Sequence, residues 1–180
     1  MAAAASTAHG RDCALIARLA ATLLQDEGVA AEPVAGAAAW RVGPADGAVI
    51  THAPRPGQAL LPGTFPFHAW VLLPSTGRVF DPTTYQLTLK AQTLDAADGG
   101  TTEVLWAPLY LVAKSAEIKT LREVALGAGW AFFYQRVAAL EPLLFADPLD
   151  PIDIHHARLV MRHPDAEVIG PNHALVRGPR

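Results

Sequence analysis

The sequence predicts a single α+β domain, and three observations lead to that fold class. An amphipathic helical repeat occupies roughly residues 11–27, and two strand-like segments joined by the turn sequence PSTG follow at 68–81. Helical periodicity then returns later in the chain. The 180 residues amount to about one domain, and 51% hydrophobic residues suffice for a normal core. We therefore treat residues 1–180 as one unit without an internal repeat or linker.

The first helix is predicted from about residue 11 to residue 27, after a flexible lead at 1–10. Apolar side chains recur at a spacing of four, and Gly28 supplies a plausible stop. At 100° per residue the only cysteine of the chain, Cys13, opens the first turn on the side that faces the core. The residues sharing that side are Cys13, Ile16, Ala20 and Leu24.

Strands dominate the prediction for the middle of the chain. Residues 32–43 and 48–53 are interpreted as two short strands, and the four prolines between 54 and 66 predict a loop. Segments 68–73 and 78–81 are predicted to form a hairpin. Residues 102–112 are interpreted as one strand, or as two interrupted at Pro108.

The last part of the chain is predicted to be helical and then irregular. Helical periodicity covers about 115–140, although Gly127 and Gly129 weaken it. Residues 141–180 are rich in proline, aspartate and histidine, which favours a loop-rich C-terminal segment with one short helix near 154–161.

Composition excludes several functional classes and suggests a compartment. The formal net charge is −3 and no cluster of lysine and arginine is present, so neither nucleic-acid binding nor attraction to a membrane surface is expected. One cysteine allows neither an intramolecular disulfide nor a cysteine-rich zinc site. A reducing compartment, the cytoplasm, is the simplest expectation. The chain start lacks a basic signal-peptide region, and Arg18 makes the first apolar stretch a core helix.

Three residues stand in an order that thiol chemistry requires. Cys13 opens a helix, His68 begins the strand HAWVLL, and Asp81 ends the strand RVFD. A thiolate is a nucleophile, and a helix N-terminus or an adjacent histidine lowers the pKa of the thiol. The histidine in turn needs a carboxylate or amide that fixes its tautomer and orientation. The sequence therefore predicts a Cys-His-Asp catalytic triad.

The predicted hairpin makes this triad testable by strand parity. With a four-residue PSTG turn, Leu73 pairs with Arg78 and Trp70 pairs with Asp81. His68 and Trp70 are two residues apart and share a face. Asp81 is thus expected on the same face as His68, with roughly 7 Å between their β-carbons.

These residues resemble the transglutaminase-like branch of the papain-like cysteine-enzyme superfamily, which also includes the arylamine N-acetyltransferases. The matching pieces are Cys13, His68 in HAWVLL and Asp81 in FDPT, and they cover roughly residues 12–84. The resemblance implies a papain-like or transglutaminase-like α+β fold, in which a nucleophile helix packs on an antiparallel sheet. It implies that Cys13 is the nucleophile, His68 the base and Asp81 the orienting group.

The oxyanion site departs from the family pattern. Papain-like proteases usually carry a glutamine a few residues before the nucleophile, and here only Thr7, His9 and Arg11 stand nearby. The backbone N–H of Cys13 can supply one oxyanion contact at the helix start. The second donor is not identified by the sequence.

The sequence supports one principal function and two alternatives. The principal expectation is a thiol-dependent hydrolase or acyltransferase acting on a peptide or small-molecule amide or (thio)ester, with Trp70 lining the substrate site and with no cofactor. The first alternative is an inactive member of the fold that binds a peptide or small ligand. The second is a metal-dependent hydrolase, although the C-terminal histidines lack a recognised ligand spacing. Those candidates are Asp153, His155, His156 and His163. The oligomeric state and the substrate are not predicted.

Overall fold

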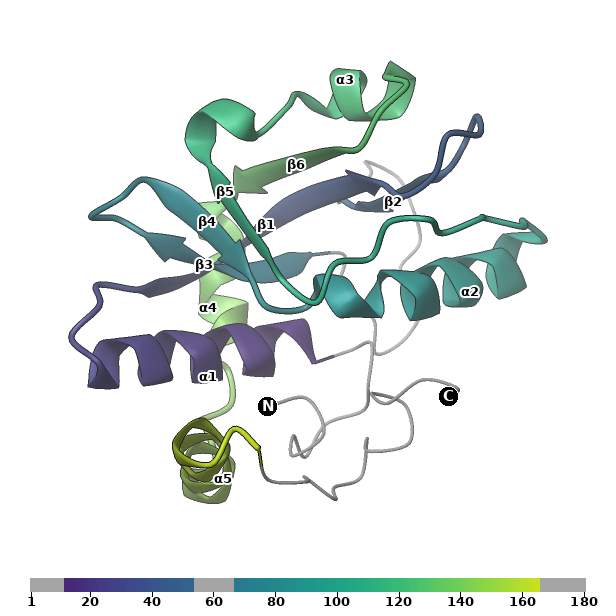
Figure 1. Ribbon diagram of the computed structural model, residues 1–180. Helices are drawn as coiled ribbons and strands as arrows, with labels where there is room; N and C mark the ends of the chain where they lie inside the picture. The colour runs from purple at the N-terminus through teal and green to yellow at the C-terminus, as the bar shows by residue number, and fades with distance from the viewer. Residues whose placement is uncertain (1–11, 54–66, 166–180) are drawn as a thin grey trace.

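The computed structural model describes residues 12–53 and 67–165, and the described chain is α+β. One curled antiparallel sheet is flanked by helices (Figure 1). Within the described residues the sheet has six strands in the order β2-β1-β3-β4-β5, with β6 paired to β1. The α+β class predicted from the sequence is thus confirmed.

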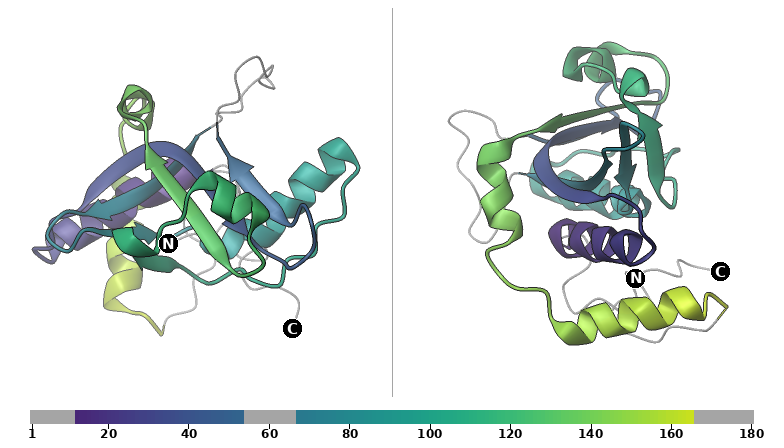
Figure 2. Two further views of the ribbon diagram at one scale, coloured as in Figure 1. Left: turned by 90° about the horizontal axis from the view of Figure 1, so that it is seen from above. Right: turned by 90° about the vertical axis from the view of Figure 1, so that its left-hand side faces the viewer.

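The first helix, α1 (Cys13–Asp26), forms as predicted and lies along one face of the sheet (Figure 2). Alanine fills its contact face, so the helix approaches β1 and β3 closely. Gly28 follows with φ of +76°, the left-handed conformation that glycine adopts without strain. The contact is made by Ala17, Ala20 and Ala21 against Ala35, Ala69 and Val71.

The longest strand, β1 (Glu32–Arg41), organises the sheet. Its first half pairs with β3 (His68–Leu73), and its second half pairs with β2 (Val49–His52). The hairpin to β4 (Arg78–Asp81) has the predicted register, because Leu73 pairs with Arg78. His68, Trp70 and Asp81 therefore share one face, which lies opposite the face covered by α1.

The other face is covered by a helix that the sequence analysis did not predict. A short 3₁₀ turn, η2 (Thr84–Gln86), leads directly into α2 (Leu87–Asp98), which ends at Gly99 with φ of +78°. Leu87 and Ala91 on α2 pack with the aromatic side chains of the sheet. The aromatic members of that core are Trp40, Trp70 and Tyr134.

Two predictions for the second half are wrong. Residues 102–110 are irregular, and the following strand is β5 (Leu111–Lys114), paired with β4. The helix predicted over 115–140 is broken, because the apolar segment AFFYQR pairs with the second half of β1 as a strand. The elements in this region are η3 (Ser115–Glu117), α3 (Leu121–Leu126), β6 (Ala131–Arg136) and η4 (Ala138–Leu140).

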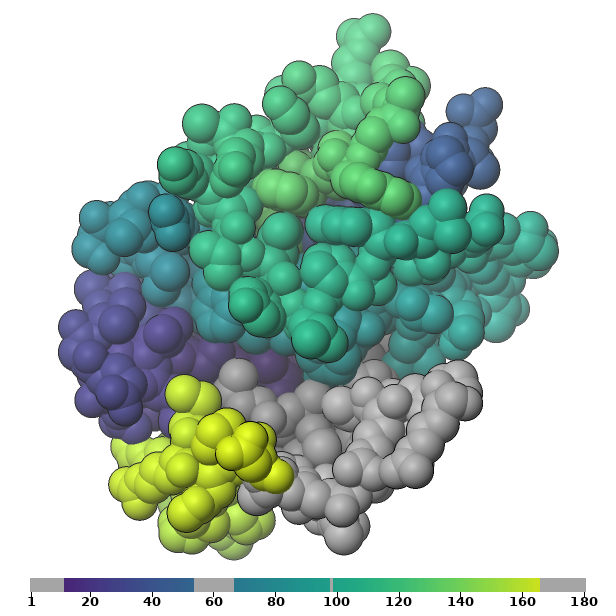
Figure 3. Space-filling model, viewed as in Figure 1, coloured from purple at the N-terminus to yellow at the C-terminus, as the bar shows by residue number. Residues whose placement is uncertain are grey.

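The C-terminal segment is more regular than expected. It forms α4 (Glu141–Leu144) and α5 (Pro151–Arg162), so the short helix predicted at 154–161 is present and longer. α5 lies against α1 on the side away from the sheet (Figures 2 and 3). The lead at 1–10, the proline-rich loop at 54–66 and the tail at 166–180 lie outside the described residues. None of the described helices has the length and apolar character needed to cross a bilayer.

Candidate functional site

The three predicted triad residues lie at the ends of three elements that meet. Cys13 is the first residue of α1, His68 is the first residue of β3, and Asp81 is the last residue of β4. α1 packs on the opposite face of β3 from the His68 side chain. Its N-terminus nevertheless reaches the start of that strand, so the thiol interacts with both the His68 ring and the backbone N–H of Ala69.

His68 and Asp81 form a buried hydrogen-bonded pair. The distance from His68 Nε2 to Asp81 Oδ2 is 2.8 Å, and both side chains are fully buried. Burial opposes the charge on each group, but their mutual attraction outweighs it. The pKa of His68 is therefore raised and the pKa of Asp81 is lowered well below its usual range. An ionised Asp81 fixes Nε2 as the protonated nitrogen and leaves Nδ1 as the site that can accept a proton.

Asp81 is held by more donors than His68 alone. Its Oδ1 accepts hydrogen bonds from the backbone N–H of Thr83 at 2.9 Å and from the Thr83 hydroxyl at 2.8 Å. Its Oδ2 also accepts from the Tyr134 hydroxyl at 2.7 Å, which in turn accepts from Trp40 Nε1 at 2.8 Å. The carboxylate is thus fixed from both sides by groups on three different elements.

Aromatic rings hold the imidazole in place. The Trp40 ring meets the His68 ring edge-on at 4.8 Å between centroids, and the Trp70 ring stacks on it at 6.2 Å. Only 2% of the Trp70 surface is exposed, so its contacts are with the imidazole and the core. The substrate contact predicted for Trp70 stays a prediction. His52 approaches the imidazole at 5.9 Å.

Cys13 is half-buried, and the pKa of its thiol is lowered. Burial raises the pKa of the thiol, but the hydrogen bond and charge of His68, the charge of Lys90 and the Ala69 N–H together bring it below its ordinary value. His68 Nδ1 has no conventional hydrogen-bond partner. Since Nε2 faces Asp81, Nδ1 is the nitrogen left for the thiol.

The residue before the nucleophile is tied to the other side of the sheet. Asp12 is buried, and its Oδ1 accepts a hydrogen bond from Gln86 Nε2 at 2.8 Å. Gln86 Nε2 also donates to the Tyr85 hydroxyl at 2.7 Å, so both amide hydrogens are used. Gln86 thus holds the start of α1 and, in this arrangement, has no hydrogen left for an oxyanion.

The oxyanion role of the Cys13 N–H stays a prediction, and no second donor is assigned. Cys13 is the first helical residue, so its backbone N–H has no acceptor within the helix. The other donors named from the sequence, Thr7, His9 and Arg11, lie outside the described residues.

The site contains residues that sequence reasoning missed. Tyr134 comes from β6, which was predicted to be helical, so no local pattern linked it to Asp81. Lys90 lies on α2, three residues after Leu87 and one before Ala91. In a helix this spacing places the lysine on the same apolar face as those two residues, and that unusual position could have identified Lys90 from the sequence. His52 ends β2 and belongs to no sequence motif that pointed to the site.

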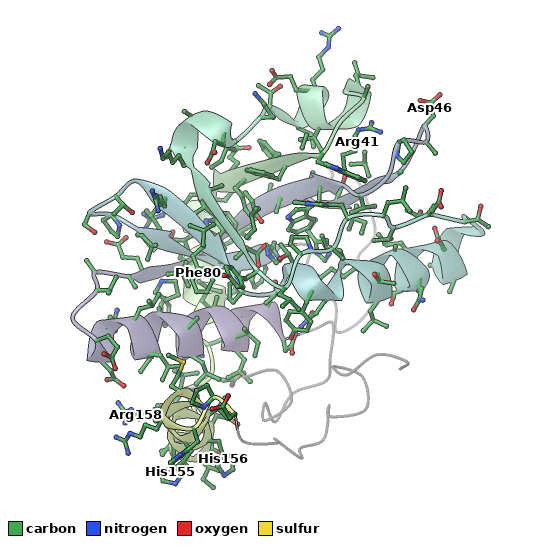
Figure 4. All side chains as sticks on the ribbon, viewed as in Figure 1. Arg41, Asp46, Phe80, His155, His156 and Arg158 are labelled. Carbon is green, nitrogen blue, oxygen red and sulfur yellow. The ribbon has the colours of Figure 1, made fainter. Side chains whose placement is uncertain are left out.

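The C-terminal histidines are remote from the site. His155 and His156 are exposed on α5, beyond α1 as seen from the sheet (Figure 4). The described residues contain no group of three or more His, Cys, Asp or Glu side chains placed to hold a metal ion. A hollow of about 350 Å³ lies at the far end of α1, lined by Leu23, Asp26 and residues of α5, and it does not include the triad.

Comparisons with known proteins add information about the fold only. Neither the models of protein families nor the curated proteins match this sequence. A crystal structure described as that of a genomics target, with no function stated, is similar with a TM-score of 0.56. The two chains are 20% identical, and the match covers 88% of this chain and 69% of that chain. The likeness supports the α+β architecture.

Proposed function

We propose that this protein is a thiol-dependent hydrolase or acyltransferase of papain-like or transglutaminase-like fold. Cys13 is the nucleophile, His68 the general base and then the general acid, and Asp81 the group that orients His68. The observation that carries the proposal is the position of the buried His68 ring, hydrogen-bonded to Asp81 at 2.8 Å and in contact with the Cys13 thiol. The single cysteine is in keeping with a reducing, cytoplasmic location.

The proposed chemistry follows from this arrangement. His68 Nδ1 takes the thiol proton, and the Cys13 sulfur attacks the acyl carbon of an amide or (thio)ester. The negative charge that develops on the carbonyl oxygen is met by the Cys13 N–H and the positive end of α1. His68 then donates its proton to the leaving group, which departs and leaves a thioester on Cys13. Water or another nucleophile, deprotonated by His68, releases the acyl group and restores the thiol.

One observation favours the alternative of a binding domain without catalysis. His68 Nδ1 lacks a conventional hydrogen bond, so the thiol and the imidazole are not yet in an ideal position for proton transfer. In that alternative the thiol behaves as an ordinary buried cysteine, and the cleft binds a peptide or small ligand.

The pH dependence of Cys13 alkylation tests the proposal. Because the chain has one cysteine, iodoacetamide reports on this site alone. A His-activated thiolate predicts a rate already near its plateau at about pH 6 in the wild type. In His68→Ala the rate should rise only above about pH 8, as for a free thiol. The matched control is His156→Ala, an exposed histidine on α5, which should keep the wild-type profile.

A wild-type alkylation rate that rises only above about pH 8, and that is the same in His68→Ala, would contradict the enzymatic proposal. The binding domain without catalysis would then be the remaining alternative. Circular dichroism and the melting temperature of each variant establish that it is folded before rates are compared. His68→Gln repeats the test with a side chain closer in size should the alanine variant be unstable.

A further inference from the structure

A buried lysine lies beside the triad and has no role in the proposed chemical steps. Lys90 belongs to the apolar face of α2, between Leu87 and Ala91, and only 6% of its surface is exposed. Lysine is among the residues least often buried, because removing an ammonium from water is costly. Its position therefore calls for an explanation.

The ammonium group points toward the triad. Lys90 Nζ lies 5.2 Å from the centre of the Trp40 ring, and that ring is 4.8 Å from the His68 ring. The positive charge of Lys90 lowers the pKa of all three triad groups, Cys13, His68 and Asp81. A cation–π contact with Trp40 compensates part of the lost hydration.

No carboxylate of the described chain neutralises this charge. Within the described residues Lys90 forms no ion pair and donates no hydrogen bond. The acid of the triad, Asp81, already accepts four hydrogen bonds from His68, Tyr134 and Thr83. Its acceptor positions are filled, so it does not serve as the partner of Lys90.

The unpaired charge is also unfavourable for the catalytic base. A cation near His68 opposes its protonation, although the same charge favours the Cys13 thiolate and the Asp81 carboxylate. An anion bound next to Lys90 would remove this cost and complete the charge balance of the site. The lysine ammonium is a compact point charge with three N–H donors, and a carboxylate is an anion that can accept from it.

We infer that Lys90 binds a carboxylate of the acyl substrate, so that the enzyme selects substrates with a negative charge close to the reacting carbonyl. The inference rests on the proposed function and adds a substrate class to it. Lys90 acts by binding and by charge, and the bond-making steps remain with Cys13 and His68.

Alkylating reagents that differ in charge test this inference without a known substrate. Iodoacetate carries a carboxylate next to the reacting CH₂ group, and iodoacetamide is its neutral counterpart. In both reactions the Cys13 sulfur displaces iodide from that carbon. The ratio of the two rates at one pH cancels the fraction of thiolate, so a change in the thiol pKa does not affect it.

Removal of the Lys90 charge is expected to lower this ratio. In Lys90→Met the iodoacetate-to-iodoacetamide ratio should fall about tenfold at physiological salt, the usual worth of a hydrogen bond between charged groups. Lys90→Arg should keep most of the wild-type ratio. Lys119→Met, at an exposed lysine remote from α2 in the sequence, is the matched control and should leave the ratio unchanged.

The possible outcomes separate this inference from the proposed function. An equal ratio in the wild type and Lys90→Met would overturn carboxylate binding, whatever the pH profile shows. A lowered ratio together with an unactivated thiol profile would support an anion site on a protein that is not an enzyme. Lys90→Gln, which shortens the stem and keeps a polar end, repeats the comparison if the methionine variant does not fold.

Discussion

At the scale of single residues, the site depends on the ionised carboxylate of Asp81. Four donated hydrogen bonds fill its acceptor positions, and its side chain is fully buried. A carboxylate held this way stays charged far below its usual pKa. Its constant charge fixes the tautomer of His68, and the geometry of that one pair sets the nitrogen that faces Cys13.

The lowered pKa of Asp81 predicts how stability changes with acid. A carboxyl whose pKa is lowered in the folded state stabilises the fold above its unfolded pKa of about 3.9 and loses that contribution as pH falls. His68 is protonated in both states below about pH 5 and does not add to the slope there. Asp81 alone should contribute about 1.4 kcal/mol of lost stability per pH unit below about pH 4.

Urea unfolding at pH 5, 4 and 3 measures that slope. Asp81→Asn should have lower stability at pH 5 and a slope reduced by the contribution of one proton. The control is Asp46→Asn, because Asp46 is exposed on the β1–β2 loop (Figure 4) and its replacement should leave the slope close to wild type. Equal slopes for wild type and Asp81→Asn would show that Asp81 is not held in its charged form.

The sequence identifies the residues with a local pattern and misses those without one. Cys13, His68 and Asp81 each stand at a helix start or a strand end, and the hairpin register brings the last two together. Tyr134 joins Asp81 only because β6 pairs with β1, a contact between distant segments. Lys90 is missed because α2 itself was not predicted.

At the scale of elements, β1 is the strand on which the sheet is built. Its residue Gly36 pairs with His68 on one side and with Arg136 on β6 on the other. A β-carbon at Gly36 would lie 1.9 Å from the backbone oxygen of Gln135 and 2.9 Å from the Trp70 ring. Glycine here therefore allows β6 and Trp70 to approach β1.

Gly36→Ala is expected to destabilise the protein by roughly 1–3 kcal/mol, because backbone rather than a mobile side chain occupies the space. The added methyl group should displace the Trp70 ring and with it the His68 ring, so Cys13 alkylation at pH 6 should become slower. Gly129→Ala is the matched control, since a β-carbon there meets no atom within 4 Å. Urea unfolding and the alkylation rate measure both effects. Equal stability of the two variants would contradict the close approach of β6.

Helices and strands were predicted correctly where the sequence of the segment itself determines its structure. α1 and the β3–β4 hairpin carry their own periodicity and turn signals, and both were predicted with the correct register or bounds to within two residues. The apolar run at 131–136 fits either a helix or a strand, and pairing with β1 decides in favour of the strand. The local sequence pattern alone therefore cannot predict that this segment is a strand.

At the scale of the whole molecule, the described chain is layered as sheet, α1 and α5 (Figure 2). The outer layer is joined to α1 by an apolar cluster of Leu19, Leu23 and Ala157. An exposed ion pair between Arg158 and Asp26 at 2.7 Å adds little, because water and salt screen such pairs. α5 thus depends on a small apolar contact with one side of α1, whereas Cys13 packs with the cluster on the sheet-facing side of that helix.

A charge in that contact should release α5 and leave the site intact. In Ala157→Asp a carboxylate would be buried against leucine, so the helix is expected to undock and stability to fall by about 2–4 kcal/mol. Amide hydrogen exchange should then show lost protection in α5, with β1 and β3 still protected. The Cys13 alkylation rate should change less than about twofold, because Cys13 packs with the cluster on the sheet side of α1 and not with the cluster under α5. The control His156→Asp introduces the same charge at the exposed neighbour and should keep α5 protected. Loss of Cys13 activation in Ala157→Asp alone would instead show that the outer layer supports the triad.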